Sequence, residues 1–570
     1  MIERRAPAAG AAAVLVLIGL VPQFLSRTLP DIAFLLYAAG RVLDGATLYV
    51  DLIEVNPPLI VWLNLPVVAV ARAVGMSDIT AYRIAVTLLL AAAIVACRWV
   101  LLRAEAGRDP VLRHLLLLAL VAALFVLPRL DWGEREHLTL ALVLPYLLLT
   151  VVRLDGKGPG TAAGAAIGVA AAVGIAIKPH FVLLWLARES LLLAARRRGP
   201  TLEGVVVVLA GAGYLLATAL FAPEYFELVR ELGPAYQVYL HNPLLLTALV
   251  GDGAALSLGA LVLAAALWPR QRSRALRLTL VVAVAAFYLA AVLQAKGWRY
   301  HFYPALALGW VLLVLVAVRL GRPLRRWTER AFAATAGAAA LTVLAVATAE
   351  SVLQAAHPLR PQYDADPSIG ELLPVATKLS GGRDLVVLSP NMASGFPLTT
   401  YAGARWPQRL SNLWPLVASY DSALRDPAPF RYRPAGEMSD LERLVLDTVG
   451  DDLATADAPM VLVLRRGPDE PRWGMRRLDL LEFLSRDERF ARFFSGYEAA
   501  GEIGQYDLYL RRDRAEREPV AGVARGRTGP APGMLAFAPD ALIVALVFGV
   551  LLAALYRRET LHGSGNPDGT

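Results

Sequence analysis

Long apolar runs recur through most of this chain, and they constrain its fold more than any other feature. Many of the Leu, Ala and Val runs reach about 18 residues or more, which is the length a helix needs to cross a bilayer. The chain is 57% hydrophobic over 570 residues, and its mean hydropathy is +0.51. That is far too apolar for a soluble protein of this length. The sequence therefore predicts a polytopic α-helical membrane protein.

The positive net charge does not indicate a nucleic-acid-binding protein. The formal charge is +8, but the arginines cluster in short loops between apolar runs. Cytoplasmic loops of membrane proteins have this composition. The single cysteine, Cys97, lies inside an apolar run, so no disulfide can form within the chain. We expect the lipid bilayer as a partner and no nucleic acid.

The apolar runs predict about twelve membrane spans, and both chain ends are expected in the cytoplasm. The predicted spans are 8–26, 80–102, 113–128, 136–152, 160–177, 180–195, 202–222, 243–268, 276–294, 303–319, 331–349 and 536–556.

The segment 57–75 is the ambiguous run, and charge favours one interpretation of it. If it lies at the interface or re-enters the membrane, the cytoplasmic loops hold 21 lysines and arginines, against eight in the opposite short loops. If it crosses, every later loop changes side and the bias reverses. An interfacial or re-entrant segment is therefore favoured, and the alternative is a chain with thirteen spans.

Residues 351–511 have a different pattern and predict an external α/β domain. Three β-type runs lie at 384–390, 460–466 and 505–511, and helical patterns such as 438–450 lie between them. The remaining predicted segments are a transmembrane module over 1–350, a Gly/Pro/Arg-rich linker over 512–535, the last span 536–556 and a disordered cytoplasmic tail over 557–570.

The predicted topology brings four charged segments to the external face. They are 29–59, 128–138, 177–181 and 295–304, the last reading "AKGWRYHFYP". Ionisable groups at the mouth of a helical bundle are costly to desolvate, which favours a functional role. Carboxylates can deprotonate a hydroxyl group or hold a metal ion, and lysine and arginine can neutralise a phosphate.

Each segment also has a plainer interpretation. Asp31 after Pro30 fits a helix N-cap, and the helix expected after it is amphipathic enough to lie along the membrane surface. "DWGEREHL" can be a solvated helix start, and "IKPH" a helix break with interfacial snorkelling. "KGWRYH" can be an interfacial anchor. It is the combination of segments on one side that favours function.

The order of these segments resembles the GT-C class of integral-membrane glycosyltransferases. An Asp follows the first span, then an interfacial helix, "GATLYVDLIEVNPPL", an acidic second loop, a Lys-containing third segment and "AKGWRYHFYP". Bacterial lipid A aminoarabinose transferases and protein O-mannosyltransferases are the most similar members. The resemblance covers roughly residues 1–350, and "WPQRLSNLW" at 406–414 extends it weakly into the later domain.

The resemblance implies an enzyme that moves a sugar from a polyprenyl-phosphate carrier to an acceptor outside the cytoplasm. The acceptor would be an envelope glycolipid, polysaccharide or protein, and the location the bacterial inner membrane. The implied residues are Asp31, Asp131 and Glu134 for catalysis, Lys296, Arg299, His301 and Lys178 for the donor phosphate, and Glu54, Asn56, Tyr37, Trp298 and Tyr300 for substrate contacts.

Two positions depart from the pattern of these enzymes. Ile32 follows Asp31 where many members have Glu, and Asn56 precedes Pro57 where aminoarabinose transferases carry Lys. Glu54 can compensate for the first change, and the second leaves the sugar undefined. The acidic loop also admits a divalent-cation site made of Asp131, Glu134, Glu136 and His137.

The chemistry expected of this site is direct displacement with inversion at the anomeric carbon. Lys296 and Arg299 would hold the phosphate as negative charge grows on it, and Asp31 would act as general base. Two other functions stay open. A flippase for lipid-linked sugars would distribute charges through the midplane and carry inverted repeats. A non-catalytic envelope assembly protein would use the external domain to bind partners.

Overall fold

The computed structural model describes residues 6–196, 199–251, 253–266, 273–318, 327–356, 369–426, 428–466 and 475–515. The predicted span 536–556 and the tail 557–570 lie outside these residues, as does the linker 512–535 apart from its first four residues.

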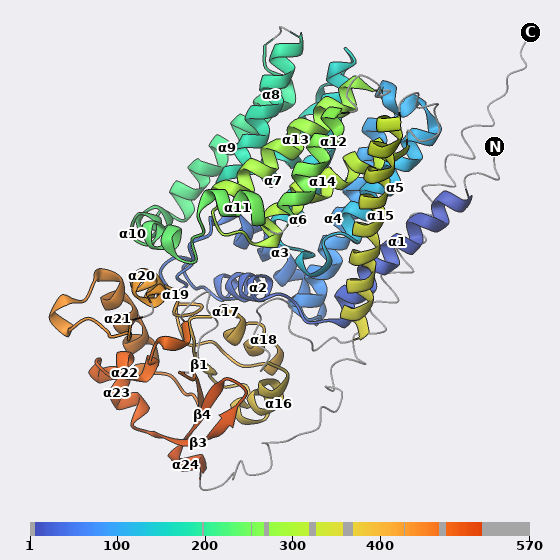
Figure 1. Ribbon diagram of the computed structural model, residues 1–570. Helices are drawn as coiled ribbons and strands as arrows, with labels where there is room; N and C mark the ends of the chain where they lie inside the picture. The colour runs from blue at the N-terminus through green and yellow to red at the C-terminus, as the bar shows by residue number, and fades with distance from the viewer. Residues whose placement is uncertain are drawn as a thin grey trace, which may run out of the picture.

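A bundle of helices makes up the first part of the chain (Figure 1). Its helices are α1 (Ala6–Leu25), α2 (Pro30–Leu43), α3 (Leu59–Val74), α4 (Asp78–Leu101), α5 (Pro110–Phe125), α6 (Arg135–Leu154), α7 (Thr161–Ala176), α8 (Val182–Arg196), α9 (Leu202–Phe221), α10 (Glu224–Val238), α11 (Leu244–Val250), α12 (Ala254–Ala266), α13 (Arg274–Leu293), α14 (Arg299–Ala317) and α15 (Trp327–Ala356). Short 3-10 turns are η2 (Glu105–Arg108), η3 (Arg129–Asp131) and η4 (Pro179–Phe181).

The described helices make the chain a multi-pass membrane protein. Six of them are long and apolar enough to cross a bilayer, or up to eight if each bent helix pair counts as one span. Three more apolar helices, α3, α5 and α7, have 16 residues each. A straight span needs about 20 residues. The predicted total of twelve spans therefore stays a prediction, as does the interfacial placement of 57–75, most of which is α3.

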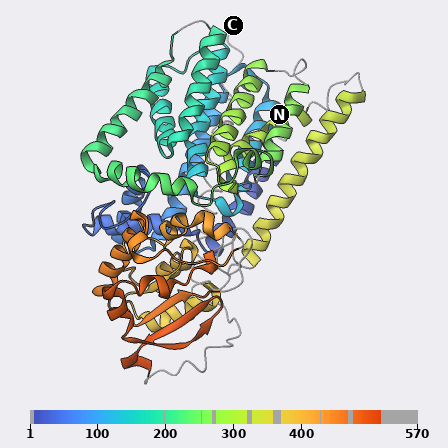
Figure 2. The same cartoon turned by 60° about the vertical axis from the view of Figure 1, so that its left-hand side comes forward.

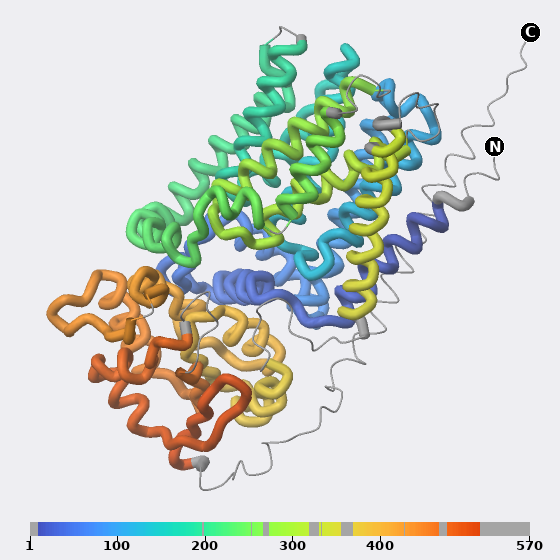
Figure 3. Tube along the Cα trace, viewed as in Figure 1, coloured from blue at the N-terminus to red at the C-terminus, as the bar shows by residue number. Residues whose placement is uncertain are grey.

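The chain turns sharply after its first helix. The axes of α1 and α2 differ by 66°. Pro30 and Asp31 begin α2, because proline is favoured in the first helical turn and an acidic side chain there faces the helix dipole favourably. Figures 1 and 3 show α2 lying between the bundle and the second part of the chain. This is the arrangement expected of a helix along the membrane surface.

The second part of the chain is an α/β domain at one end of the bundle (Figure 2). Its elements are α16 (Ile369–Ser380), β1 (Val386–Leu388), α17 (Met392–Gly395), α18 (Leu398–Ala402), α19 (Trp414–Ser419), α20 (Asp421–Arg425), η7 (Ala435–Glu437), α21 (Asp440–Ala454), β2 (Met460–Leu464), η8 (Met475–Arg477), α22 (Leu480–Leu484), α23 (Glu488–Phe494), β3 (Tyr497–Ile503), β4 (Tyr506–Arg511) and α24 (Arg512–Ala515).

One four-stranded mixed sheet organises this domain. The strand order is β1-β2-β4-β3, with β1 parallel to β2 and the other pairs antiparallel. β2 is paired on both sides and buried along its whole length, which explains its uninterrupted apolar sequence. The three predicted strands are confirmed as β1, β2 and β4. β3 was not predicted, because "YEAAGEI" is mostly exposed and carries little apolar signal.

The domain is attached to the bundle through α2, α10 and the loop before α3. Phe34 packs edge-on against Phe396 at 5.2 Å. The Ile53 amide donates a hydrogen bond of 2.9 Å to the Arg409 carbonyl. Leu232 of α10 lies in the apolar core of the domain. These contacts fix the domain over the same end of the bundle that carries Asp31.

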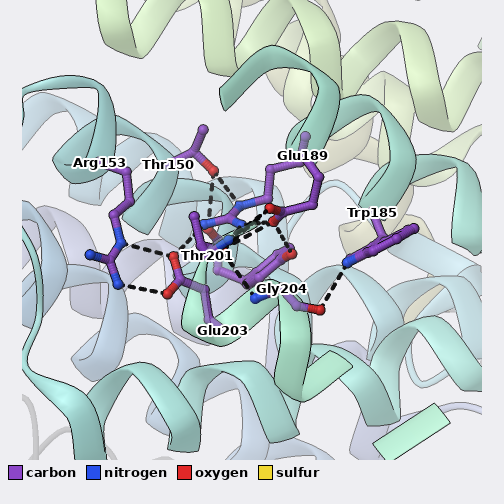
Figure 4. Close-up of polar contacts among 9 residues, drawn as sticks. Thr150, Arg153, Trp185, Glu189, Thr201, Glu203 and Gly204 are labelled. Carbon is purple, nitrogen blue, oxygen red and sulfur yellow. Dashed lines mark hydrogen bonds and ion pairs between the residues drawn. The ribbon is translucent and has the colours of Figure 1, made fainter. Parts of the chain in front are cut away.

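A buried ion cluster ties α6, α8 and α9 together at the opposite end of α6 (Figure 4). Arg188 binds Glu203 at 2.8 Å and also bonds Thr150 and Thr201. Arg153 donates two further hydrogen bonds to Glu203. Two arginines face Glu203 and Glu189, so the charges balance, and we interpret the cluster as structural.

Candidate active site

The carboxylate of Asp31 lies in the first turn of α2 and is held by an arginine. Arg135 Nη2 lies 2.9 Å from Asp31 Oδ2, and Arg135 Nη1 also bonds the side-chain oxygen of Asn56. Asn56 in turn donates to Glu54 from its backbone amide at 2.8 Å and from its side chain at 2.6 Å. Asp31 keeps 30% of its side chain exposed, whereas Arg135 is buried. Asp31 is therefore oriented yet open to a substrate.

Three consecutive charged residues begin α6 beside Asp31. Glu134 lies 3.9 Å from Arg135 Nε and is fully buried. Burial, and next the negative charge of Asp31, raise the pKa of Glu134 well above its usual value. A carboxyl group in this environment can hold its proton and donate a hydrogen bond.

A lysine reaches the same place from the turn between α7 and α8. Lys178 Nζ lies 2.5 Å from Glu136 Oε1 and 5.2 Å from the centre of the Tyr300 ring. His301 Nε2 lies 3.8 Å from the same carboxylate oxygen. Burial lowers the pKa of Lys178, and Glu136 opposes this effect. Burial also lowers the pKa of His180 to about 3.

Several polar atoms at this place are buried and make no hydrogen bond among the described residues. They are Arg135 Nε, Glu136 Oε2, His180 Nε2 and His301 Nδ1. Buried polar atoms are nearly always paired, so a cluster of unpaired ones is typical of a site that takes a polar ligand. We call the whole set the Asp31 group. Its members are Asp31, Glu54, Asn56, Glu134, Arg135, Glu136, Lys178, His180, Tyr300 and His301.

The structure gives Lys296 and Arg299 separate partners, and their predicted binding of a donor phosphate stays a prediction. Lys296 Nζ donates to backbone carbonyls at the end of α10, at 2.8 Å to Tyr236, 3.3 Å to Gln237 and more closely to Tyr239. Arg299 binds Asp131 at 2.8 Å and the Pro128 carbonyl at 3.1 Å. The two cations, neighbours in sequence, therefore point into different parts of the structure because one precedes α14 and the other begins it.

The four residues predicted to hold a divalent cation do not converge in the structure. Asp131 is paired with Arg299, and Glu136 is paired with Lys178. His137 is engaged at both ring nitrogens, by the Gly133 amide and the Leu124 carbonyl. In the part of the chain that the structure describes, no group of three or more His, Cys, Asp or Glu residues could hold a metal ion. Participation of a divalent cation stays a prediction.

Two predicted substrate contacts also lie elsewhere. The Tyr37 hydroxyl donates to the Trp406 carbonyl at 2.8 Å, so this residue joins α2 to the α/β domain. Trp298 packs on Tyr300 and His301 at 5.6 and 5.2 Å. It therefore packs against two members of the Asp31 group, Tyr300 and His301.

Sequence reasoning missed Arg135, the residue that joins Asp31 to Asn56. Its signal was a cation flanked by Glu134 and Glu136 at the start of a span. It also missed Tyr236 of α10, which packs edge-on against Trp414 at 5.5 Å. The charges of Arg135 and Asp31 act on the Tyr236 hydroxyl, whose pKa is raised mainly by burial. No feature of the sequence near Tyr236 indicates this position.

Comparison with known proteins adds little to the geometry. No family model matches the chain, and no curated protein matches it. A cryo-EM structure of the arabinofuranosyltransferase AftD from mycobacteria is similar, with 18% sequence identity and a TM-score of 0.39. The match covers 90% of this chain and 40% of that one, so the chain spans less than half the length of that protein. A TM-score this low carries no argument for fold or activity.

Proposed function

We propose that this protein is a membrane glycosyltransferase that uses a polyprenyl-phosphate-linked sugar and an extracytoplasmic envelope acceptor. The observation that carries the proposal is the Asp31 group. It combines an oriented, partly open carboxylate with two buried cations, Arg135 and Lys178, and with unpaired polar atoms around them. The resemblance of residues 1–350 to GT-C enzymes supports the same reaction class.

The donor phosphate would lie against Arg135, Lys178, His180 and His301. Arg135 Nε and His301 Nδ1 are two of the unpaired atoms, and a guanidinium group matches phosphate geometry well. Positive charge at this position stabilises the leaving polyprenyl phosphate as its negative charge grows. Loss of one such donor typically reduces the rate by roughly 100-fold or more.

Asp31 would act as general base on the acceptor. Its carboxylate takes the proton of the acceptor hydroxyl or amine, and the acceptor atom attacks the anomeric carbon. The bond from that carbon to the phosphate oxygen breaks, and polyprenyl phosphate leaves with its electron pair. A single displacement of this kind inverts the anomeric configuration. A positioned general base contributes roughly 100- to 10,000-fold.

The experiment uses the full chain in lipid nanodiscs with a panel of labelled polyprenyl-phosphate sugars and envelope extract. We expect one labelled sugar to be transferred, and Asp31→Asn to abolish transfer. Asp44→Asn, at the other end of α2, is the matched control, because Asp44 pairs with Arg72 on the exposed surface. Near-normal turnover by Asp31→Asn would contradict the role of Asp31 as general base. Translocation of an intact donor without cleavage would identify a flippase instead.

A further inference from the structure

Glu54 is buried in the loop between α2 and α3, and its carboxylate is bonded within the chain. The residue is 6% exposed, whereas Asp31 keeps 30% of its side chain exposed. Glu54 Oε1 accepts hydrogen bonds from the backbone amide of Asn56 at 2.8 Å and from its side-chain amide at 2.6 Å. The carboxylate therefore faces Asn56, and burial leaves it little surface for contact with a substrate.

Every polar group of Asn56 has a partner within the chain. Its backbone amide and its side-chain amide both donate to Glu54. Its side-chain oxygen accepts from Arg135 Nη1, and its backbone carbonyl accepts from the Tyr49 hydroxyl at 2.8 Å. Because the side-chain nitrogen donates and the side-chain oxygen accepts, these partners fix the Asn56 amide in one orientation.

Arg135 connects Asn56 to Asp31. Its Nη1 donates to Asn56, and its Nη2 lies 2.9 Å from Asp31 Oδ2. The donors of a guanidinium group are fixed in one plane, so the position of one nitrogen constrains the position of the other. Asn56 thereby constrains the direction from which Arg135 reaches Asp31.

The α/β domain holds the stretch of loop that carries Glu54. The Ile53 amide donates a hydrogen bond of 2.9 Å to the Arg409 carbonyl, and Ile53 pairs with Leu410 in a parallel bridge. Arg409 is itself held by Asp452, through its backbone amide and its Nε, both at 2.7 Å. Glu54 follows Ile53 directly, so the domain helps to fix the position of Glu54.

We propose that Glu54 is a positioning residue, which acts through Asn56 on Arg135 and so holds Asp31 in place for proton transfer. This role differs from the substrate contacts that the sequence resemblance implies for Glu54 and Asn56. The inference rests on the proposed glycosyltransferase function, in which Asp31 is the general base. A reacting group that is misplaced by roughly 1 Å can lose about 100-fold in rate. The consequence of losing Glu54 is therefore a lower rate of transfer.

The test is sugar transfer by the full chain in lipid nanodiscs, with the labelled polyprenyl-phosphate sugar that the native chain transfers. We expect Glu54→Ala to reduce kcat by about 10- to 100-fold, because Arg135 is no longer fixed in its direction toward Asp31. The donor KM should change less than kcat, since Glu54 does not touch the donor. A raised KM with native kcat would overturn the inference, because it would identify a substrate contact.

Asp51→Ala is the matched control in the same loop. Asp51 also accepts a hydrogen bond from a backbone amide, that of Thr47 at 2.7 Å. Among the described residues, it makes no hydrogen bond to Asn56 or Arg135. We expect native kcat in this variant. A loss of kcat as large as that of Glu54→Ala would overturn the inference, because the stability of the loop alone would then account for both.

A double variant shows whether Glu54 acts through Asn56. If it does, Glu54→Ala has no further effect on kcat once Asn56→Ala is present, because the two residues act as a unit. The double variant then has the kcat of Asn56→Ala. Losses of kcat that multiply in the double variant would overturn the inference, because Glu54 would then act independently of Asn56.

An exchange of donor and acceptor gives a rescue experiment that keeps the side chains close to their native sizes. Asn56→Asp alone places a second carboxylate against Glu54 Oε1, where the native contact is 2.6 Å, and should reduce kcat. Adding Glu54→Gln supplies an N–H donor to that carboxylate, which still accepts from Arg135, and should restore most of kcat. The Tm of each variant in detergent shows that it is folded. No recovery of kcat in a double variant with native Tm would overturn the inference.

The native chain separates the failure of this inference from the failure of the proposed function. If the native chain transfers no sugar from any donor, the proposed function fails and the positioning role fails with it. If the native chain transfers a sugar and Glu54→Ala retains native kcat and KM, the positioning role alone is overturned.

Discussion

Arg135 is the residue on which the candidate site depends most. It holds Asp31 and Asn56 together and lies beside Glu134, and its Nε is unpaired. A guanidinium can serve several partners at once because its donors are fixed in a plane, whereas an ammonium group is a point charge. Replacement by lysine is therefore not conservative at this position.

We expect Arg135→Gln to reduce kcat by about 100-fold or more, because it removes both the anchor of Asp31 and a donor to the phosphate. The kcat of Arg135→Lys should lie between that of Arg135→Gln and that of the native protein. Steady-state kinetics with the donor identified above would measure both effects. Arg230→Gln, on the exposed side of α10, is the matched control. Native-like kcat and KM in Arg135→Gln would contradict the assignment.

Lys296 has a structural role that the sequence did not reveal. Its ammonium group binds the last carbonyls of α10, where positive charge also faces the negative end of the helix dipole. The side-chain amide of Asn242 donates a hydrogen bond of 2.8 Å to the Lys296 carbonyl. Lys296 thereby fixes the end of α10 that carries Tyr236.

The burial of Lys296 predicts a pH dependence of stability. Burial lowers the pKa of Lys296 from its usual 10.5 to about 8, so between these values the unfolded chain binds more protons than the native one. The contribution of Lys296 to the free energy of unfolding should therefore rise with pH across this range. We expect the difference in Tm between the native protein and Lys296→Met to increase from pH 8 to pH 10. A decrease would contradict the prediction.

The elements of the bundle are joined by buried charges as well as by apolar contacts. Glu203, at the start of α9, accepts hydrogen bonds from Arg153 of α6 and Arg188 of α8 and is fully buried. Removing one partner of such a cluster leaves the others uncompensated. This cost is typically about 3–5 kcal/mol for a buried pair.

Glu203→Gln should therefore destabilise the protein and lower its Tm in detergent by several degrees. Asp44→Asn breaks an exposed ion pair with Arg72 and should change stability by less than about 1 kcal/mol. Differential scanning fluorimetry of both variants would measure the effect. Equal Tm values for the two would show that the cluster does not hold α6, α8 and α9 together.

At the scale of the whole molecule, the proposed activity requires the α/β domain and the Asp31 group to be outside the cytoplasm. Both lie at the same end of the bundle, since α2 and α10 contact the domain. Charge counting predicts that this end is outside. The single native cysteine, Cys97, is buried, so introduced cysteines can be labelled with little background.

We expect Asp440→Cys, at the start of α21, to react with a membrane-impermeant maleimide in intact cells. Arg108→Cys, in the loop between α4 and α5, should react only after permeabilisation. Both positions are exposed on the protein surface. Gel-shift quantification of labelling would compare the two. The reverse pattern would place the domain in the cytoplasm and exclude an extracytoplasmic acceptor.

The sequence by itself determined the class of fold and most of the candidate site. Apolar run length predicts membrane helices, and short apolar runs of β-type composition predict β1, β2 and β4, because both signals come from neighbouring residues. Asp31 and Lys178 were identified because charged residues beside apolar runs are conspicuous, and Glu54 and Asn56 were identified from the resemblance to GT-C enzymes. The structure brings these residues into one place.

Only the tertiary structure decided how each side chain is used. Lys296 and Arg299 are three positions apart, yet one binds the end of α10 and the other binds Asp131 of η3. Their partners lie about 60 and 170 residues away in the chain. A charged residue is visible in the sequence, but its counterion is set by helix packing. For that reason the sequence indicated which residues were unusual, and the fold determined that Arg135 binds Asp31.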